Sequence, residues 1–200
     1  SPAEALRRLA GSPVVRVAEL DWVVTRAEVS NDPRYLDGSL WGMHGDEITA
    51  GSNPYGTGAD EAWARGHVGS RSVHVGVIDE GIQWSHEDLS ANTWVSPGEV
   101  AGNGRDDDRN GYVDDVRGWD FYNGDASVFD GDPTLGWDAH GTHVAGTIGA
   151  VGGNGIGVAG VAWQVTMIPA KFMGASSGFI SGAIAATDYL VDLKARHGID

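Results

Sequence analysis

The sequence of 200 residues contains no cysteine, which excludes disulfide bonds, cysteine nucleophiles and thiolate metal ligands. Basic residues are scarce: 13 Lys and Arg stand against 28 Asp and Glu, giving a formal net charge of −15. Nucleic acid is therefore not expected as a partner, because phosphate binding requires clustered basic side chains. No apolar run approaches the ~18 residues of a membrane span, so no membrane partner is expected. An acidic surface instead fits a secreted protein, or one that binds cations through carboxylates.

The middle and the C-terminal part of the sequence alternate between strand-like and helix-like segments. Residues 72–79 form a short apolar, β-branched run typical of a buried parallel strand, and a second such run follows at 165–173. Helices are predicted from about 141 to 150 and over 180–197, where apolar residues recur near helical spacing. This alternation predicts an α/β fold with a parallel sheet.

A short N-terminal unit and a long loop make up much of the remainder. Residues 2–11 have the pattern of an amphipathic helix ended by Gly11, and a strand-like run of alternating apolar residues follows at 14–24. Residues 97–138 are loop-like, with dense Gly, Asp and Asn. An irregular segment of that length inside a domain indicates a functional or ion-binding role.

Two residues lie at positions where α/β proteins commonly have functional side chains. Asp79 ends the first predicted strand and His140 lies at the start of the following helix, positions that meet at one edge of a parallel sheet. A histidine that acts as a base needs a carboxylate to fix its tautomer, and Asp79 is the candidate. The spacing alone also allows a turn-forming Asp79, or a metal site made by Asp79 with His86, His140 and His143.

Two motifs resemble those of the subtilisin-like serine peptidases. VGVIDEGI at 75–82 is similar to the family's aspartate motif, and HGTHVAGTIGA at 140–150 is similar to its histidine motif, in the same order and spacing. The resemblance implies that Asp79 is the orienting acid, that His140 is the general base, and that His143 is a structural residue.

The resemblance also implies a domain organisation. Residues 1–29 resemble the C-terminal part of an inhibitory propeptide, and residues 30–200 the N-terminal portion of the peptidase domain. The implied fold is the family's three-layer α/β arrangement with a parallel sheet, incomplete on its C-terminal side. An edge strand and apolar helix faces are then expected to be exposed, so the chain would self-associate or pair with the missing C-terminal half.

The sequence departs from the family pattern in two respects. Glu80 stands where the family usually has Thr or Ser, and its charge is expected to raise the pKa of His140 or to alter an adjacent subsite. The family's Gly-Thr-Ser-Met-Ala nucleophile motif and its oxyanion asparagine are absent from the 200 residues. Without those groups little hydrolysis remains, so this chain alone is predicted to be inactive.

The segment GASSG at 174–178 permits two interpretations. It fits the G-x-S-x-G nucleophile elbow of α/β-hydrolases, but the residues after Ser176 offer no separate acid and base, so we reject that interpretation. By the resemblance, it is the glycine-rich edge that pairs with the substrate backbone. Gly174, Ser176 and Gly178 are therefore the predicted substrate-binding residues.

Calcium is the predicted cofactor, because it binds about 6–8 oxygen ligands from carboxylates, amides and carbonyls. The resemblance implies one site at the turn GGNGIGVAG (152–160), although the glycines could merely shape that turn. Its ligands would be Asp32, Asp88, the Asn154 side chain and the carbonyls of Gly152, Ile156 and Val158.

Two further cation sites are predicted in the acidic loop. Asp120, Asn123 and Asp125 in GWDFYNGD match a calcium site of thermitase-like members of the family. Asp106, Asp108 and Asn110, followed by Gly111, reproduce the start of an EF-hand loop, but Arg117 occupies the twelfth position. A strict EF-hand is excluded, and Asp114 or Asp115 would have to close the site.

Three functions remain open from the sequence. The first is a secreted, calcium-dependent subtilisin-like serine endopeptidase that acts on protein or peptide substrates, of which this chain is an N-terminal portion. The second is a pseudoprotease, a calcium-stabilised binding module without catalysis. The third is a metallohydrolase that uses the histidine and aspartate set named above.

Overall fold

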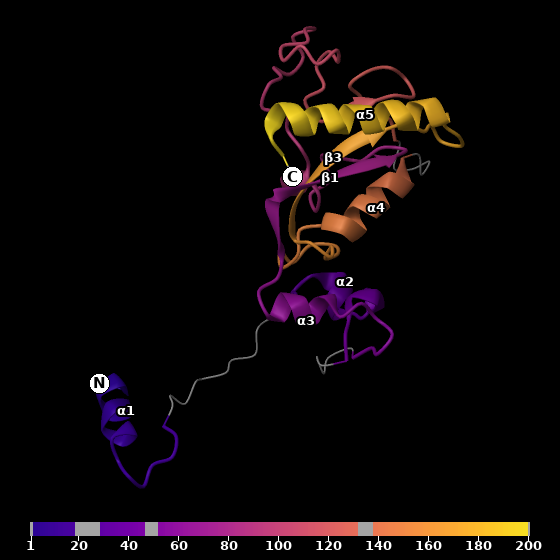
Figure 1. The fold of residues 1–200 in the computed structure, drawn as a ribbon. Coiled ribbons are helices and arrows are strands. Elements are labelled where there is room, and N and C mark those ends of the chain that lie inside the picture. The colour runs from indigo at the N-terminus through magenta and orange to yellow at the C-terminus, as the bar shows by residue number, and fades with distance from the viewer. Residues whose placement is uncertain (1, 19–28, 47–51, 132–137, 200) are drawn as a thin grey trace.

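The structure, a computed structural model, describes residues 2–18, 29–46, 52–131 and 138–199. Its centre is a parallel sheet with the strand order β1-β3-β2, formed by β1 (Gly69–Asp79), β2 (Trp119–Asp120) and β3 (Gln164–Lys171) (Figure 1). The register pairs Asp79 of β1 with Lys171 of β3, and Lys171 with Asp120 of β2. The last residues of all three strands therefore lie side by side at the carboxyl edge of the sheet.

Two helices cover opposite faces of this sheet (Figure 1): α4 (Ala139–Gly149) and α5 (Ile180–His197). Val165 and Met167 of β3 belong to the apolar cluster that includes α4, whereas Ile168 packs with Tyr189 and Leu193 of α5. Strand β3 is thus buried on both faces, which explains its almost continuously apolar sequence. The predicted α/β class, with a parallel sheet between helical layers, is confirmed.

The N-terminal elements are short. A third apolar cluster joins Tyr35, Met43 and Trp63 with Ala159, which follows the glycine-rich turn. The remaining elements are α1 (Pro2–Ala10), α2 (Pro33–Leu36), the 3-10 helix η1 (Trp41–Met43), α3 (Ala59–Ala64) and the 3-10 helix η2 (Ser90–Asn92).

The predicted and observed elements differ in two places. The strand predicted over 14–24 is wrong for residues 14–18, which form turns and irregular backbone; the rest of that run lies outside the described residues. Val14 and Val17 are 89% and 77% exposed, so the apolar alternation there has no core to pack against. Strand β2 was not predicted, because two residues carry no periodicity.

Helix α5 also has an outward face with large apolar side chains. Ile180, Ile184 and Val191 are 81%, 58% and 63% exposed. Across the described ranges, no helix has both the length and the apolar character needed to cross a membrane.

Glycines set how closely the helices approach the sheet. A Cβ on Gly76 of β1 would overlap Leu190 of α5, and a Cβ on Gly149 of α4 would overlap Val165 of β3. Gly146, one turn earlier in α4, has no atom within 4 Å of the place where a Cβ would lie.

The two glycines of α4 should respond in opposite directions to alanine. We expect Gly149→Ala to lower the free energy of unfolding by about 1–3 kcal/mol, because the methyl group overpacks a filled core. Gly146→Ala should raise it by roughly 0.5–1 kcal/mol, because alanine restricts the unfolded chain. Thermal melts monitored by circular dichroism would check this, and equal effects of both variants would contradict the packing described here.

Candidate active site

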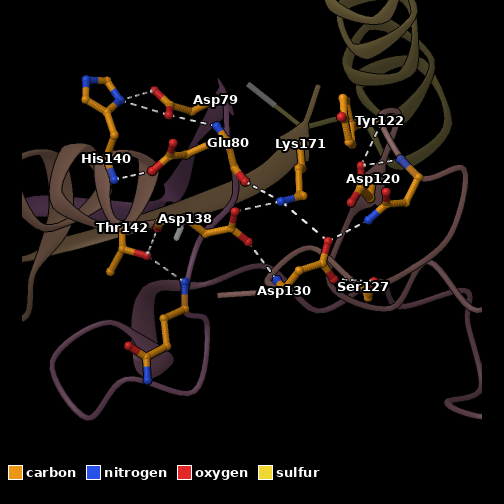
Figure 2. A network of polar contacts seen from close by, with 12 residues as sticks. Asp79, Glu80, Asp120, Tyr122, Ser127, Asp130, Asp138, His140, Thr142 and Lys171 are labelled. Atoms are coloured by element: carbon orange, nitrogen blue, oxygen red, sulfur yellow. Dashed lines mark hydrogen bonds and ion pairs between the residues drawn. The ribbon is translucent and has the colours of Figure 1, made fainter. Parts of the chain in front are cut away.

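The site is built at the carboxyl edge of the sheet, where β1 ends beside the start of α4. The imidazole Nδ1 of His140 lies 2.9 Å from Oδ1 and 3.0 Å from Oδ2 of Asp79 (Figure 2). The Asp79 side chain is 15% exposed and that of His140 is 72% exposed. A largely enclosed carboxylate therefore accepts the hydrogen bond of an imidazole that remains open to solvent.

This pair can act as a base. When Nδ1 carries the proton donated to Asp79, the lone pair of Nε2 is free to accept a proton. The hydrogen bond to Asp79, the charge of Asp79 and the smaller effect of Glu80 raise the pKa of His140 above its ordinary value. The environment therefore favours the protonated imidazole that forms when His140 takes up a proton.

Glu80 connects the acid to the helix of the base. Its backbone N–H donates to Oδ1 of Asp79 at 2.7 Å, and its carboxylate Oε1 accepts a hydrogen bond from the backbone N–H of His140. A carboxylate at the first turn of a helix also interacts favourably with the helix dipole. Gly141 makes this close approach possible, because a Cβ there would overlap the carbonyl oxygen of Gly81.

Three further residues of this network were not predicted from the sequence. Lys171, Asp138 and Asp130 lie beside Glu80, linked by the hydrogen bonds and ion pairs drawn in Figure 2. Lys171 ends a strand of the parallel sheet, as Asp79 does, and this shared position was the signal that could have revealed it.

Comparison with known proteins supports this assignment. Residues 70–198 match the Subtilase family, well over half of the chain. This chain belongs to the subtilase family. The predicted resemblance, carried by the motifs around Asp79 and His140, is confirmed.

Three curated relatives illustrate the range of similar subtilases. The chain is 37% identical over 183 residues to an extracellular basic protease of Dichelobacter nodosus, covering 86% of this chain and 27% of that protein. It is 34% identical over 183 residues to an extracellular protease of Xanthomonas campestris pv. campestris, covering 88% and 28%. For subtilisin-like protease 1 of Plasmodium vivax, the identity is 40% over 122 residues, covering 60% and 18%. The chain thus spans no more than 28% of the length of these relatives.

One solved structure was also compared with the chain. It is described as proteases from Pseudoalteromonas arctica, and it aligns with a TM-score of 0.46 at 29% identity, covering 80% of this chain and 43% of that chain.

The predicted substrate-binding residues of this subtilase lie in a tight turn between β3 and α5. Met173 and Gly178 form an antiparallel bridge, and the N–H of Gly174 donates to the carbonyl of Ser177 at 3.0 Å. Ser176 is exposed at the tip of this turn. The substrate-binding role of the turn stays a prediction.

The predicted metallohydrolase ligands do not come together. His140 is hydrogen-bonded to Asp79, whereas His86 and His143 line a cavity of about 300 Å3 whose lining includes neither Asp79 nor His140. His143 is exposed rather than packed as a structural residue, so that expectation is wrong. Of the residues that the structure describes, just one set of three or more His, Asp and Glu side chains has the spacing of a metal site, and it contains none of these four. The metallohydrolase alternative is therefore wrong.

The first predicted calcium site is assembled around the glycine-rich turn. The Asp32 carboxylate is buried and accepts the backbone N–H groups of Gly153, Asn154 and Gly155 at 2.7–3.1 Å. Asp88 accepts the Asn154 side-chain amide at 2.8 Å and the N–H of Val158 at 2.9 Å. Asp32, Asp88 and Asn154 are thus neighbours as predicted, but the carboxylates of Asp32 and Asp88 accept hydrogen bonds from N–H groups and, at Asp32, also from the Ser30 hydroxyl. The ligand roles of the Gly152, Ile156 and Val158 carbonyls stay predictions.

The second predicted site is divided among different partners. Oδ1 of Asp120 accepts hydrogen bonds from the backbone N–H groups of Tyr122 and Asn123. The side-chain amide of Asn123 donates to Asp130 at 2.6 Å. Asp125 accepts a hydrogen bond from the Ser127 hydroxyl. Burial raises the pKa of Asp120 to about 6, although the hydrogen bonds from Asn123 and Tyr122 lower it. Calcium binding by Asp120, Asn123 and Asp125 stays a prediction.

The third predicted site gains one carboxylate that was not predicted, that of Glu99. Ligand oxygens of Asp106 and Asp108 lie within 4.8 Å of one another and of Glu99, which no sequence signal identified. Asp115, fully buried, accepts the Asn110 amide at 2.8 Å, while Asp114 binds the N–H groups of residues 103 and 104 instead. Of the two candidates to close the loop, the structure thus favours Asp115.

Burial also leaves oxygens without partners at this third site. Oε2 of Glu99 and Oδ1 of Asp115 are buried and accept no hydrogen bond. Burial raises the pKa of Asp115 to about 6, with smaller contributions from the charges of Asp108 and Glu99. The hydrogen bonds from Tyr189 and Asn110 lower this pKa but do not outweigh burial.

The charges around His140 should be measurable in its titration. We expect Asp79→Asn to lower the pKa of His140, because it removes both the hydrogen bond and the charge that raise it, and Glu80→Gln to lower it by less. NMR titration of the imidazole would check this, with Glu87→Gln, an exposed position, as the charge-matched control. A titration that does not move in Asp79→Asn would contradict the observed pairing.

The same interaction links stability to pH. The folded pKa of His140 lies above its unfolded value, so the stabilisation is fully present below about 6.5 and is lost as the pH rises through the folded pKa. Asp79→Asn should therefore lower the melting temperature more at pH 5.5 than at pH 8.5. An equal loss at both values would show that Asp79 does not stabilise the protonated imidazole.

Proposed function

We propose that this chain is the N-terminal portion of a secreted, calcium-dependent serine endopeptidase that hydrolyses peptide bonds in protein substrates. The observation that carries the proposal is the bond from His140 Nδ1 to Asp79 at 2.9 Å, at the edge where two motifs of the subtilase family meet. In this arrangement His140 Nε2 takes the proton of a serine hydroxyl and later returns it to the leaving amine.

The nucleophile comes from outside the 200 residues in this proposal. The sequence has no Gly-Thr-Ser motif, so the base would be positioned here and the serine would come from another segment. The exposed face of α5, with Ile180, Ile184 and Val191, offers an apolar surface against which further structure can pack. Without such a segment, the chain alone is expected to show no turnover, and its apolar face to promote self-association.

Secretion and a propeptide complete the proposal. The relatives from Dichelobacter nodosus and Xanthomonas campestris are named extracellular proteases, and the net charge of −15 suits a soluble exported protein. Residues 1–29 would be the end of the propeptide and residues 30–200 the start of the peptidase domain.

The catalytic assignment is tested on the full-length protein that contains this chain. Hydrolysis of a fluorogenic peptide is expected to be blocked by phenylmethylsulfonyl fluoride. It should fall roughly 10⁴-fold in kcat in His140→Ala and in Asp79→Asn. His67→Ala, at an exposed histidine, is the matched control and should leave the rate unchanged. Hydrolysis that survives His140→Ala would contradict the assignment, and no hydrolysis of any peptide would favour the pseudoprotease.

Calcium is proposed to bind in the loop that contains Asp106 and Asp108. Their carboxylates, with that of Glu99, have the spacing of a ligand set, and the partnerless oxygens of Glu99 and Asp115 are buried beside them. Oxygen-rich sites of this kind suit calcium, which would neutralise carboxylates that otherwise repel. Asn110 would contribute from the same loop, while the Asp88 and Asp120 sites remain additional candidates.

Removal of calcium should destabilise the protein. At a calcium concentration 100 times the Kd, binding adds about 2.7 kcal/mol, so EDTA should lower the melting temperature by roughly 5–10 °C. Glu99→Gln should abolish most of that difference, whereas Glu87→Gln should retain it. Identical melting curves with calcium and with EDTA would count against every cation site proposed here.

A further inference from the structure

Lys171 is a buried cation at the carboxyl edge of the sheet. Its ammonium donates to the carbonyl oxygen of Glu80 and to Oδ1 of Asp138, both at 2.7 Å, and Oδ2 of Asp130 lies 3.5 Å away. These oxygens match the three N–H donors of an ammonium group. The side chains of Lys171 and Asp138 are each 2% exposed, so the pair is desolvated and removal of either partner would leave a buried charge uncompensated.

The ammonium joins the two backbone segments that carry Asp79 and His140 (Figure 2). Glu80 directly follows Asp79 and donates its N–H to that carboxylate. Asp138 lies two residues before His140, at the N-cap of α4, with a left-handed φ of 56°. Such a backbone conformation is unfavourable for most residues, and the ion pair with Lys171 holds it in place.

We propose that Lys171 is a positioning residue: through Asp138 and the Glu80 carbonyl, it fixes the end of β1 against the start of α4 and thereby the orientation of the His140 imidazole. The inference rests on the proposed roles of Asp79 and His140. Among the described contacts, the ammonium makes no hydrogen bond to either of those two side chains, so its effect passes through their neighbours.

The charge of Lys171 and its positioning role act on His140 in opposite directions. A nearby cation disfavours the protonated imidazole, so removing it raises the pKa of His140 if electrostatics alone operate. The hydrogen bond from His140 to Asp79 is the largest cause of the raised pKa of His140, so loosening that bond lowers the pKa. The charges that face the imidazole on this side are those of Asp79 and Glu80, with Asp138 behind them.

The test is an NMR titration of His140 in this chain, with its signals assigned by comparison with His140→Gln. We expect Lys171→Met to lower the pKa of His140 by roughly half a pH unit or more and to weaken the low-field Nδ1–H signal. Lys171→Arg keeps the charge but replaces a compact ammonium with a planar group, so a smaller fall in the same direction is expected. Lys194→Met, on the exposed side of α5, is the matched control and should change neither observable.

Each outcome decides the question. A pKa of His140 that rises or stays unchanged in Lys171→Met, with the circular dichroism of the folded chain retained, overturns the positioning role. If Lys171→Met does not fold, Lys171→Arg decides instead, and an unchanged pKa there overturns the role. Because the readout requires no hydrolysis, a lowered pKa would uphold the positioning role even if the full-length protein had no peptidase activity.

Discussion

The register between β1 and β3 determines which side chains meet at the carboxyl edge of the sheet. Asp79 and Asp120 stand on either side of Lys171, so a cation lies between two strand-end carboxylates. Side chains alternate between faces along a strand, and a slip of one residue would therefore move Lys171 to the other face. The position of α4 depends on the same register, because its N-cap residue Asp138 is held by this lysine.

The acidic chain holds many of its carboxylates with backbone N–H groups. Asp32 accepts three of them, and Asp120 accepts two through one oxygen. Such bonds satisfy the oxygens of buried carboxylates, which a chain with a net charge of −15 requires when it buries several acidic residues. Glu99, Asp115 and Asp120 each also keep one buried oxygen that accepts no hydrogen bond. Among the described residues, the loop of Glu99 and Asp115 is distinguished from the other two candidate cation sites by carboxylates that have the spacing of a metal-ligand set.

The sequence predicted the fold well where periodicity or motif spacing carried the information. The strand ending at Asp79, most of β3 and the helix after His140 were predicted, because apolar runs are local signals. Strand β3 ends at Lys171, two residues before its predicted end, and β1 is buried only at Val77 rather than along the whole predicted run. The run at 14–24 had the same local signal, and residues 14–18 form no strand, because strand formation also needs a partner. The pairing of Asp79 with His140 was predicted from the fold type and the family motifs.

Other parts of the site depend on long-range contacts that no local pattern encodes. Glu99 lies in the same loop as Asp106, seven residues before it, but belongs to no motif that would mark it as a ligand. The exposure of His143 was also missed, because helical spacing fixes which residues share a face but not whether that face is covered. The strand-end position of Lys171 is a local signal, but its contacts are not, since its partners are 33 and 91 residues away in the chain.

Position 138 has to satisfy two demands that few amino acids meet together. Its left-handed backbone favours Gly, Asn and Asp, whereas the buried ammonium beside it calls for an anion. Glutamate carries the charge, but on a longer side chain, and its backbone disfavours the left-handed conformation. Asparagine accepts that conformation but carries no charge. Aspartate alone meets both, so the mutational tolerance of this residue should be among the narrowest in the chain, although it neither donates nor accepts the proton in the proposed reaction.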